Sequence, residues 1–337
     1  PNPRTEGTRM CADRAFDMLE IALEQGPNSG PFTFVNYGVA RAEGAMGVHK
    51  LVAKTVTRRG QTMKAILNDL PRKDFSVIEH FGNAALSPYG AEVELSKQSF
   101  FERVVEPGSV SLGFSVNAMH WLSRPAPAIP NHIHASASLD PQVMRNFERI
   151  AQEDWKTLLA RRSEELATGG HLILVNMARD HSGYYKGWNG KDTNLHDVMH
   201  QLWLRMFREG KFGLEVYNSA NFQKYYKSED EYKRVLKDRT SEAYRNGLRL
   251  VDIRTERVPC PHRARFDETG DVERFGRDFV KSVWGWSHRT FRGALEGHPE
   301  GEALLEEYYQ GLTDVVMSKP HRFSLDHFEN YLHIKKV

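Results

Sequence analysis

The sequence has few cysteines and no long apolar run, and each absence excludes a class of protein. The two cysteines, Cys11 and Cys260, are too few for a disulfide framework or a cysteine-rich zinc site. The longest apolar runs, such as residues 172–175, are far shorter than the roughly 20 residues that cross a bilayer. The polar start, residues 1–9, shows no apolar core of a signal peptide. We therefore expect a cytoplasmic protein that does not span a membrane.

An excess of charge of one sign is also missing. The chain has 46 Lys and Arg residues against 44 Asp and Glu residues, a formal net charge of +2. A nucleic-acid-binding protein usually shows a basic domain or stripe, so we expect no nucleic acid among the partners. Hydrophobic residues make up 40% of the 337 residues, which is enough for a sizeable core. This length corresponds to about two domains.

Strand-like and helical segments alternate over the first half of the chain. Short apolar runs predict strands, and apolar residues at helical spacing predict helices. We expect strands at residues 32–35, 63–67, 110–116 and 171–177, and helices at 11–25, 48–56, 74–80 and 140–166, the last ended by Gly169-Gly170. The alternation predicts a Rossmann-like α/β fold, whose mostly parallel sheet is covered by helices on both faces.

The second half of the chain is predicted to be mainly helical. Helices are expected at residues 197–207, 225–249, 275–286 and 302–316, with a strand at 250–254. We interpret residues 184–270 as a mainly helical cap, with a returning strand, over the carboxyl edge of the sheet. Residues 1–183 would form the cofactor-binding core, and residues 271–337 would add the helices and the strand that complete it.

Candidate site residues follow the predicted strands, because ligands of open parallel sheets sit outside the carboxyl ends of the strands. Asn36 and Gly38 follow the first strand, but the spacing from Gly38 to Gly44 is not that of a dinucleotide fingerprint, so an ordinary turn is the slightly favoured alternative. Asp69 follows the second strand, 31 residues after Gly38. Its carboxylate could accept hydrogen bonds from a ribose, or it could simply cap the next helix before Pro71.

A His-Trp pair, His120-Trp121, directly follows the third expected strand. The imidazole ring and the indole N–H could together hold a carboxylate, while the indole face packs against an apolar substrate. The alternative is a buried tryptophan with a capping histidine, which we would prefer from these two residues alone.

Several segments together resemble the SABATH family of methyltransferases, which use S-adenosylmethionine (SAM) to esterify acids such as salicylate and jasmonate or to methylate xanthine nitrogens. The most specific match is Leu67-Asn68-Asp69-Leu70-Pro71, followed by Asp74-Phe75. Residues 99–103, 110–123 and 147–170 are similar to three further family segments, and 217–218 and 304–318 match more loosely. The resemblance implies a SAM-dependent carboxyl methyltransferase.

The resemblance also implies roles for individual residues. Asp69 would bind the ribose hydroxyls of SAM, and Leu70 would flank its adenosine. His120 and Trp121 would face the acceptor carboxylate as the catalytic pair. No metal would be required, although some members have a magnesium site near the segment matched by Glu215, Tyr217 and Asn218. A homodimer is the implied assembly. The further implied contacts are Asn36, Gly38, Ser99, Phe100 and Ser115 for SAM, and Met18, Asn117, Met119 and Tyr217 for the small organic acid.

The sequence departs from the family pattern in two places. Asn36 stands where the family's first strand ends in an acidic residue, and the following loop is longer. In the N-terminal family segment YxxNSxxQ, Cys11 takes the place of the Tyr and Met18 that of the Gln. By the same resemblance, both changes fall where the methionine half of SAM would meet the carboxylate. They leave open a SAM-binding protein that methylates another acceptor, or one that catalyses a non-methylating rearrangement or cyclisation.

A metallohydrolase is a second alternative. His196 and His200 stand at helical positions i and i+4 with Asp197 between them, which resembles the HExxH zinc motif, and His132 and His134 could add ligands. The shorter aspartate would not reach as a glutamate base does, and 15 histidines make chance pairs common. We therefore disfavour this interpretation.

Overall fold

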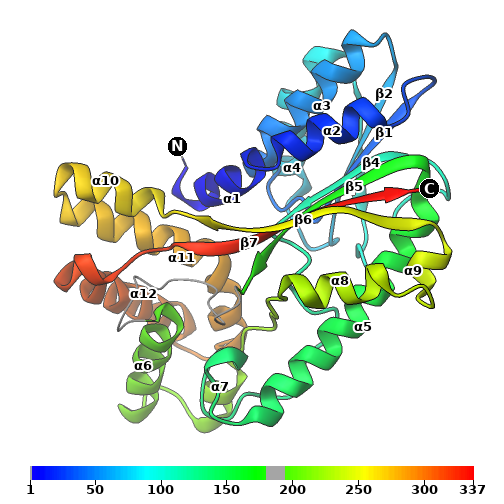
Figure 1. Ribbon diagram of the computed structural model, residues 1–337. Coiled ribbons are helices and arrows are strands. Elements are labelled where there is room, and N and C mark those ends of the chain that lie inside the picture. Colours follow the sequence, from blue (N-terminus) through cyan, green and yellow to red (C-terminus); the bar gives the residue numbers. More distant parts are fainter. Residues whose placement is uncertain (1, 180–193) are drawn as a thin grey trace.

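A seven-stranded sheet forms the centre of the computed structural model, which describes residues 2–179 and 194–337 (Figure 1). The strand order is β3-β2-β1-β4-β5-β7-β6. The five strands from β3 to β5 pair in parallel, whereas β7 runs antiparallel to both β5 and β6. The strands are β1 (Phe32–Tyr37), β2 (Met63–Asp69), β3 (Glu92–Lys97), β4 (Val110–Val116), β5 (Leu166–Ala178), β6 (Leu248–Val258) and β7 (His327–Lys336).

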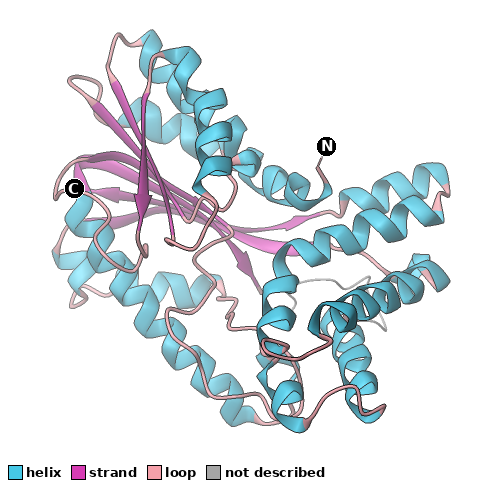
Figure 2. Cartoon of the chain, turned by 180° about the vertical axis from the view of Figure 1, so that it is seen from behind, coloured by secondary structure: helices cyan, strands magenta, loops and turns pink. Residues whose placement is uncertain are grey.

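Helices cover both faces of the sheet, as Figure 2 shows from behind. Alternate side chains of a strand point to opposite faces, so Phe34 of β1 packs with helices α1 to α4, whereas Val35 packs with α5, α8 and α9. The helices of the first face are α1 (Pro3–Asp13), α2 (Phe16–Gln25), α3 (Met46–Arg58) and α4 (Phe75–Leu86). Those of the second are α5 (Pro141–Glu165), α8 (Glu229–Lys237) and α9 (Glu242–Arg245).

The remaining helices share an apolar cluster of their own, which we call the cap cluster. They are α6 (Leu195–Arg208), α7 (Leu214–Ser219), α10 (Pro261–Thr269), α11 (Val272–Ala294) and α12 (Gly301–Ser318). In Figure 1 these helices lie beyond the end of the sheet at which β5 finishes and β7 begins. This is the carboxyl edge of the parallel strands, so the cap cluster and the sheet enclose the region where a ligand is expected.

The structure confirms the predicted α/β sheet and all four predicted parallel strands. The strand β3 was not predicted, because its side chains alternate between exposed and half-buried at the edge of the sheet and carry three charges. The helix end predicted at Gly169-Gly170 is wrong: α5 ends at Glu165, and both glycines lie within β5. A Cβ on Gly170 would lie 2.7 Å from the carbonyl oxygen of Val110, so the glycine allows β5 to pair closely with β4.

Two predicted helices are interrupted. Residues 11–25 belong to two helices, α1 and α2, separated at Arg14-Ala15. Residues 225–249 contain α8, α9 and the start of β6, in place of one charged helix. The predicted start of the cap, residue 184, lies outside the described residues. No helix in the described part of the chain is long and apolar enough to cross a membrane.

Candidate active site

Unusual backbone conformations mark the carboxyl edge of the sheet. Among the described residues, three that are not glycine have a positive φ: Ala40 (56°), Ala42 (61°) and Asn117 (54°). The two alanines lie in the loop after β1, and Asn117 follows β4 directly. Such conformations cost free energy and cluster at functional sites. Their position supports a ligand site in the two loops that the sequence singles out.

Gly38 is where these two loops meet. Its φ is +69°, and its N–H donates to the carbonyl of Asn68 at the end of β2. A Cβ at this position would overlap the Cβ of Ala118 and lie 3.3 Å from the ring of Phe100. The backbone after β1 therefore approaches the β4 loop and the Phe100 segment so closely that only a glycine fits at this position.

Replacing Gly38 with alanine is expected to lower the affinity for SAM about tenfold or more and to destabilise the fold. Adopting this left-handed φ costs an alanine roughly 1–2 kcal/mol, and the methyl group must also displace Ala118. Isothermal titration with SAM and urea unfolding measure the two effects. Gly30→Ala is the control, because Gly30 has a φ of +74° and open space around it. Equal behaviour of the two variants would show that SAM binding does not depend on the close approach at Gly38.

Asp69 is held rigidly at the end of β2. One carboxylate oxygen accepts the backbone N–H of Ala40 at 2.7 Å, and the other accepts the N–H of Leu70 at 2.7 Å. Each carboxylate oxygen has a second lone pair that can accept another hydrogen bond, which suits a pair of ribose hydroxyls. Asp69 also ties the β1 loop to β2. These observations fit the predicted SAM-binding role of Asp69 and place Leu70 beside it.

Asn36 is fully buried beneath α3 instead of lying in the open loop. Its amide nitrogen lies 2.8 Å from Nε2 of His49, and burial lowers the pKa of His49 to about 4. The pair is therefore neutral near pH 7. The uncharged Asn36, which stands where the family has an acidic residue, is thus paired with an uncharged imidazole. The sequence did not indicate His49 as the partner.

The segment of Ser99 and Phe100, two of the SAM contacts that the resemblance implies, is held in place by α5. Ser99 Oγ accepts the N–H of Phe101, and the Phe100 carbonyl accepts Nη1 of Arg162 at 2.7 Å. Ser115, in contrast, faces β1, where its hydroxyl donates to the carbonyl of Tyr37 at 2.8 Å and is fully buried. The structure therefore brings the Phe100 ring against Gly38 and gives Ser115 a hydrogen bond between β4 and β1.

His120 and Trp121 lie among aromatic rings that sequence reasoning did not assemble. The two rings stack with centroids 5.9 Å apart, and Tyr226 lies 5.5 Å from His120. His134, 5.4 Å from Tyr226, extends the group. Burial, together with the charges of Lys224 and His132, holds the pKa of His134 well below its usual range. His134 is therefore a neutral hydrogen-bonding group among these aromatic rings.

A buried lysine, Lys224, completes this group. It forms an antiparallel bridge with Trp121, and its Nζ lies 4.2 Å from the Trp121 ring centroid and 4.3 Å from that of Trp286. Only 3% of Lys224 is exposed. The sequence prediction missed it because no motif surrounds it, and the family comparison drew attention only to neutral donors. A buried ammonium beside His120 and Trp121 adds a positive charge at the predicted acceptor end.

The other predicted acceptor contacts lie apart from one another. Met119 packs in the apolar cluster on the α5 face of the sheet, whereas Met18 is buried in the cluster on the α1–α4 face. Tyr217 lies on α7, where its hydroxyl is 2.8 Å from Nε2 of His200. Asn117 lies at the edge of the sheet, with its amide facing Glu329. The structure brings none of these four to the His120–Trp121 pair by a described hydrogen bond.

The histidines of the metallohydrolase alternative do not converge on one point. His200 faces His132 and Tyr217, whereas His196 faces His134, and His132 pairs with Asp197 at 3.0 Å. Among the described residues, a single group of three His, Cys, Asp or Glu side chains brings its ligand atoms within 4.8 Å of one another: Cys11, His327 and Glu329. It includes neither the histidine pair of α6 nor Glu215 on α7.

Comparison with known proteins defines the class. The structure of loganic acid methyltransferase with SAH superposes with a TM-score of 0.77, over 99% of this chain and 95% of that one, at 17% identity. The chain thus has the fold of a SAM-dependent methyltransferase. A family model described as SAM dependent carboxyl methyltransferase matches residues 8–269, and the chain belongs to this family.

Sequence relatives agree with this assignment. Methyltransferase FUS9 of Gibberella fujikuroi is 25% identical, over 94% of this chain and 87% of its own length. Anthranilate O-methyltransferase 3 of Zea mays is 24% identical, over 69% of this chain and 65% of its own length.

Proposed function

We propose that the protein transfers a methyl group from SAM to the carboxylate of a small organic acid, giving a methyl ester and S-adenosylhomocysteine. The observation that carries the acceptor assignment is the buried Lys224 ammonium between Trp121 and Trp286, beside His120. An ammonium with neighbouring ring N–H donors suits a carboxylate, and the surrounding aromatic rings suit an apolar body. An aromatic or otherwise apolar acid therefore fits better than a highly charged one.

The chemistry needs positioning more than proton transfer. A carboxylate with a pKa near 4 is already ionised and nucleophilic at neutral pH, so no general base is required. SAM supplies the methyl group on a positively charged sulfur when bound. Asp69 would hold the ribose hydroxyls, while Lys224, His120 and Trp121 would orient one carboxylate oxygen and keep water from the other side. Such alignment supplies much of the barrier reduction in reactions of two bound partners.

Labelled SAM tests the proposal directly. The purified chain is incubated with methyl-labelled SAM and a panel of acids that includes anthranilate and loganic acid, the compounds named for two relatives. We expect label in a base-labile methyl ester of at least one acid. SAM binding without label transfer to any acid would contradict the proposal. Label in a nitrogen or hydroxyl acceptor would instead support the altered-acceptor alternative.

Lys224→Met is expected to raise the KM for the accepted acid about tenfold or more, with a smaller change in kcat. Removing a charge-assisted hydrogen bond to a carboxylate costs roughly 1.5–3 kcal/mol. Initial rates at varied acid concentration measure KM and kcat separately, and circular dichroism confirms folding. Lys211→Met, on the exposed surface beside Glu307, is the matched control and should leave KM unchanged. An unaltered KM in Lys224→Met would argue against this residue as the carboxylate partner.

The proposal includes the cytoplasmic location and the homodimer that the sequence and the family resemblance imply. Light scattering on the purified chain tests the assembly.

A further inference from the structure

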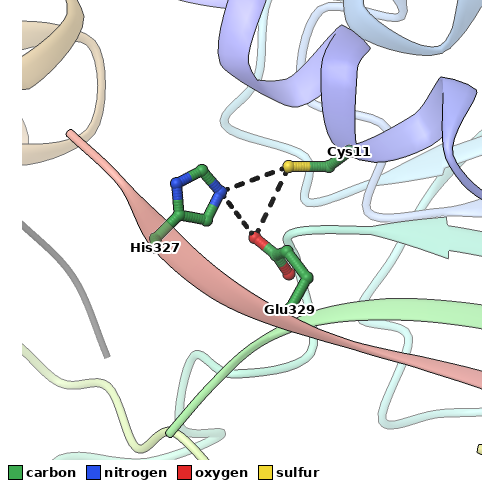
Figure 3. Close-up of side chains that lie close together, drawn as sticks. All are labelled: Cys11, His327 and Glu329. Atoms are coloured by element: carbon green, nitrogen blue, oxygen red, sulfur yellow. Dashed lines mark hydrogen bonds and ion pairs between the residues drawn. The ribbon is translucent and has the colours of Figure 1, made fainter. Parts of the chain in front are cut away.

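Three side chains capable of binding a metal meet at the start of β7. Cys11 comes from α1, and His327 and Glu329 stand two residues apart on β7, so that both point to the face covered by α1 (Figure 3). Cys11 Sγ lies 3.3 Å from His327 Nε2 and 3.6 Å from Glu329 Oε1, and the last two atoms are 3.1 Å apart. All three residues are buried.

These separations match those of ligands around one ion. Zinc bonds of about 2.3 Å to sulfur and about 2.0–2.1 Å to nitrogen and oxygen, at tetrahedral angles, place the ligand atoms roughly 3.3–3.6 Å apart. The three measured separations lie at or close to this range. A thiolate, an imidazole and a carboxylate form a ligand set that favours zinc-type ions over magnesium, which prefers oxygen ligands.

Neighbouring groups orient two of the three side chains for this task. His327 Nδ1 lies 3.0 Å from the carbonyl oxygen of Leu325, so Nδ1 carries the proton and Nε2 presents its lone pair to the cluster. The Asn117 amide, with its nitrogen facing Glu329, donates to both carboxylate oxygens at 2.9 and 3.0 Å. Metal-binding histidines and carboxylates characteristically have such supporting hydrogen bonds.

We propose that Cys11, His327 and Glu329 bind one divalent ion of the zinc type, with a fourth coordination position open to a neighbouring cavity. The cavity, of about 80 Å³, is lined by His327 and Asn117 and by Met177 and Trp286. A water occupies about 30 Å³ in the liquid, so there is room for a water or for one ligand oxygen. On binding, the Cys11 thiol loses its proton to solvent and the thiolate becomes a ligand.

Metal titration tests the proposal without using methyl transfer, so its outcome is separate from that of the proposed function. The full chain is treated with a chelator, dialysed, and titrated with Zn²⁺ by calorimetry and with Co²⁺ by absorption. We expect one ion per chain and a thiolate-to-cobalt charge-transfer band. Cys11→Ser should abolish the band, and His327→Gln should weaken Zn²⁺ binding at least about 100-fold, the upper end of what loss of a supporting group costs.

Cys260→Ser is the matched control. Cys260, the other cysteine, caps α10 by accepting the N–H of Arg263, a role that serine can take over. The control should keep both the band and the affinity. Glu329→Gln is a second, nearly isosteric ligand variant, so the test does not depend on Cys11→Ser folding correctly. Circular dichroism measures the folding of each variant. Absence of the cobalt band in the unaltered chain, or its persistence in Cys11→Ser, would overturn the proposal and leave a hydrogen-bonded thiol.

Discussion

Replacing Asp69 with asparagine is expected to lower the affinity for SAM about 100-fold. Both carboxylate oxygens already accept a backbone N–H, from Ala40 and Leu70. In asparagine, an NH₂ group replaces one of these oxygens and would face a backbone N–H, donor against donor. The β1 loop would then lose its hydrogen bond to residue 69, and the ribose would lose one acceptor. Each hydrogen bond to a charged group is worth roughly 1.5–3 kcal/mol, and two at the lower value give about 100-fold.

Calorimetric titration with SAM and with S-adenosylhomocysteine measures this change. Asp74→Asn is the control, because Asp74 lies five residues further along the chain and caps α4 through the N–H of Ser76. Asparagine caps a helix about as well as aspartate, so this control should bind SAM almost normally. Unchanged affinity in Asp69→Asn would show that the cofactor does not depend on this carboxylate.

Replacing Arg162 with methionine is expected to lower the free energy of unfolding by about 3–5 kcal/mol, the usual cost of leaving one partner of a buried ion pair alone. Arg162 and Glu165 are both fully buried. Glu165 accepts hydrogen bonds from Arg162, from the Tyr37 hydroxyl at 2.6 Å and from the N–H of Val104. Arg162 also donates to the carbonyls of Phe100 and Glu102. The pair therefore fastens the Phe100 segment to β1 and α5.

Urea unfolding measures the loss, and the neighbouring pair Arg161–Glu164 provides the control. It has the same i, i+3 spacing on α5, but its side chains are 44% and 32% exposed. Arg161→Met should therefore cost about 0–1 kcal/mol. The double variant Arg162→Met, Glu165→Leu should recover only part of the loss, because it leaves no unpaired buried charge but removes the acceptor of the Tyr37 hydroxyl and the Val104 N–H. Equal losses from Arg161→Met and Arg162→Met would contradict the role of the buried pair.

The sequence predicted the features that depend on local pattern. The buried strand β5 contains a continuous apolar run at residues 172–175, and β4 has only small residues between its apolar ones, because helices cover both faces of these strands. The end of β2 was identified through Asp69 and Leu70, because the segment around them closely resembles a family motif. The edge strand β3 gave no such signal, since its exposed and half-buried residues can be polar.

The features that depend on distant contacts could not be predicted in this way. Arg162 lies beside Arg161 in a charged stretch of α5, and its complete burial arises from the loop that follows β3. Lys224 comes next to Trp121 only because the two segments pair across the chain. Cys11 and His327 are separated by 316 positions, so neither indicates the other. The family resemblance also assigned Met18 a role through an ungapped alignment of residues 11–18. In the structure, these residues belong to two helices, because α1 ends at Asp13 and α2 begins at Phe16.

The position of β7 determines when the sheet can be completed during synthesis. Among the described strands, β6 pairs with β7 alone, and β7 also pairs with β5. Residues 327–336 must therefore leave the ribosome before β6 has a strand to pair with, although β6 itself ends at Val258. The same residues bring His327 and Glu329 to Cys11. A nascent chain that ends before residue 327 thus carries an unpaired edge on β5 and an unpaired β6. A ribosome stalled there would release an aggregation-prone product.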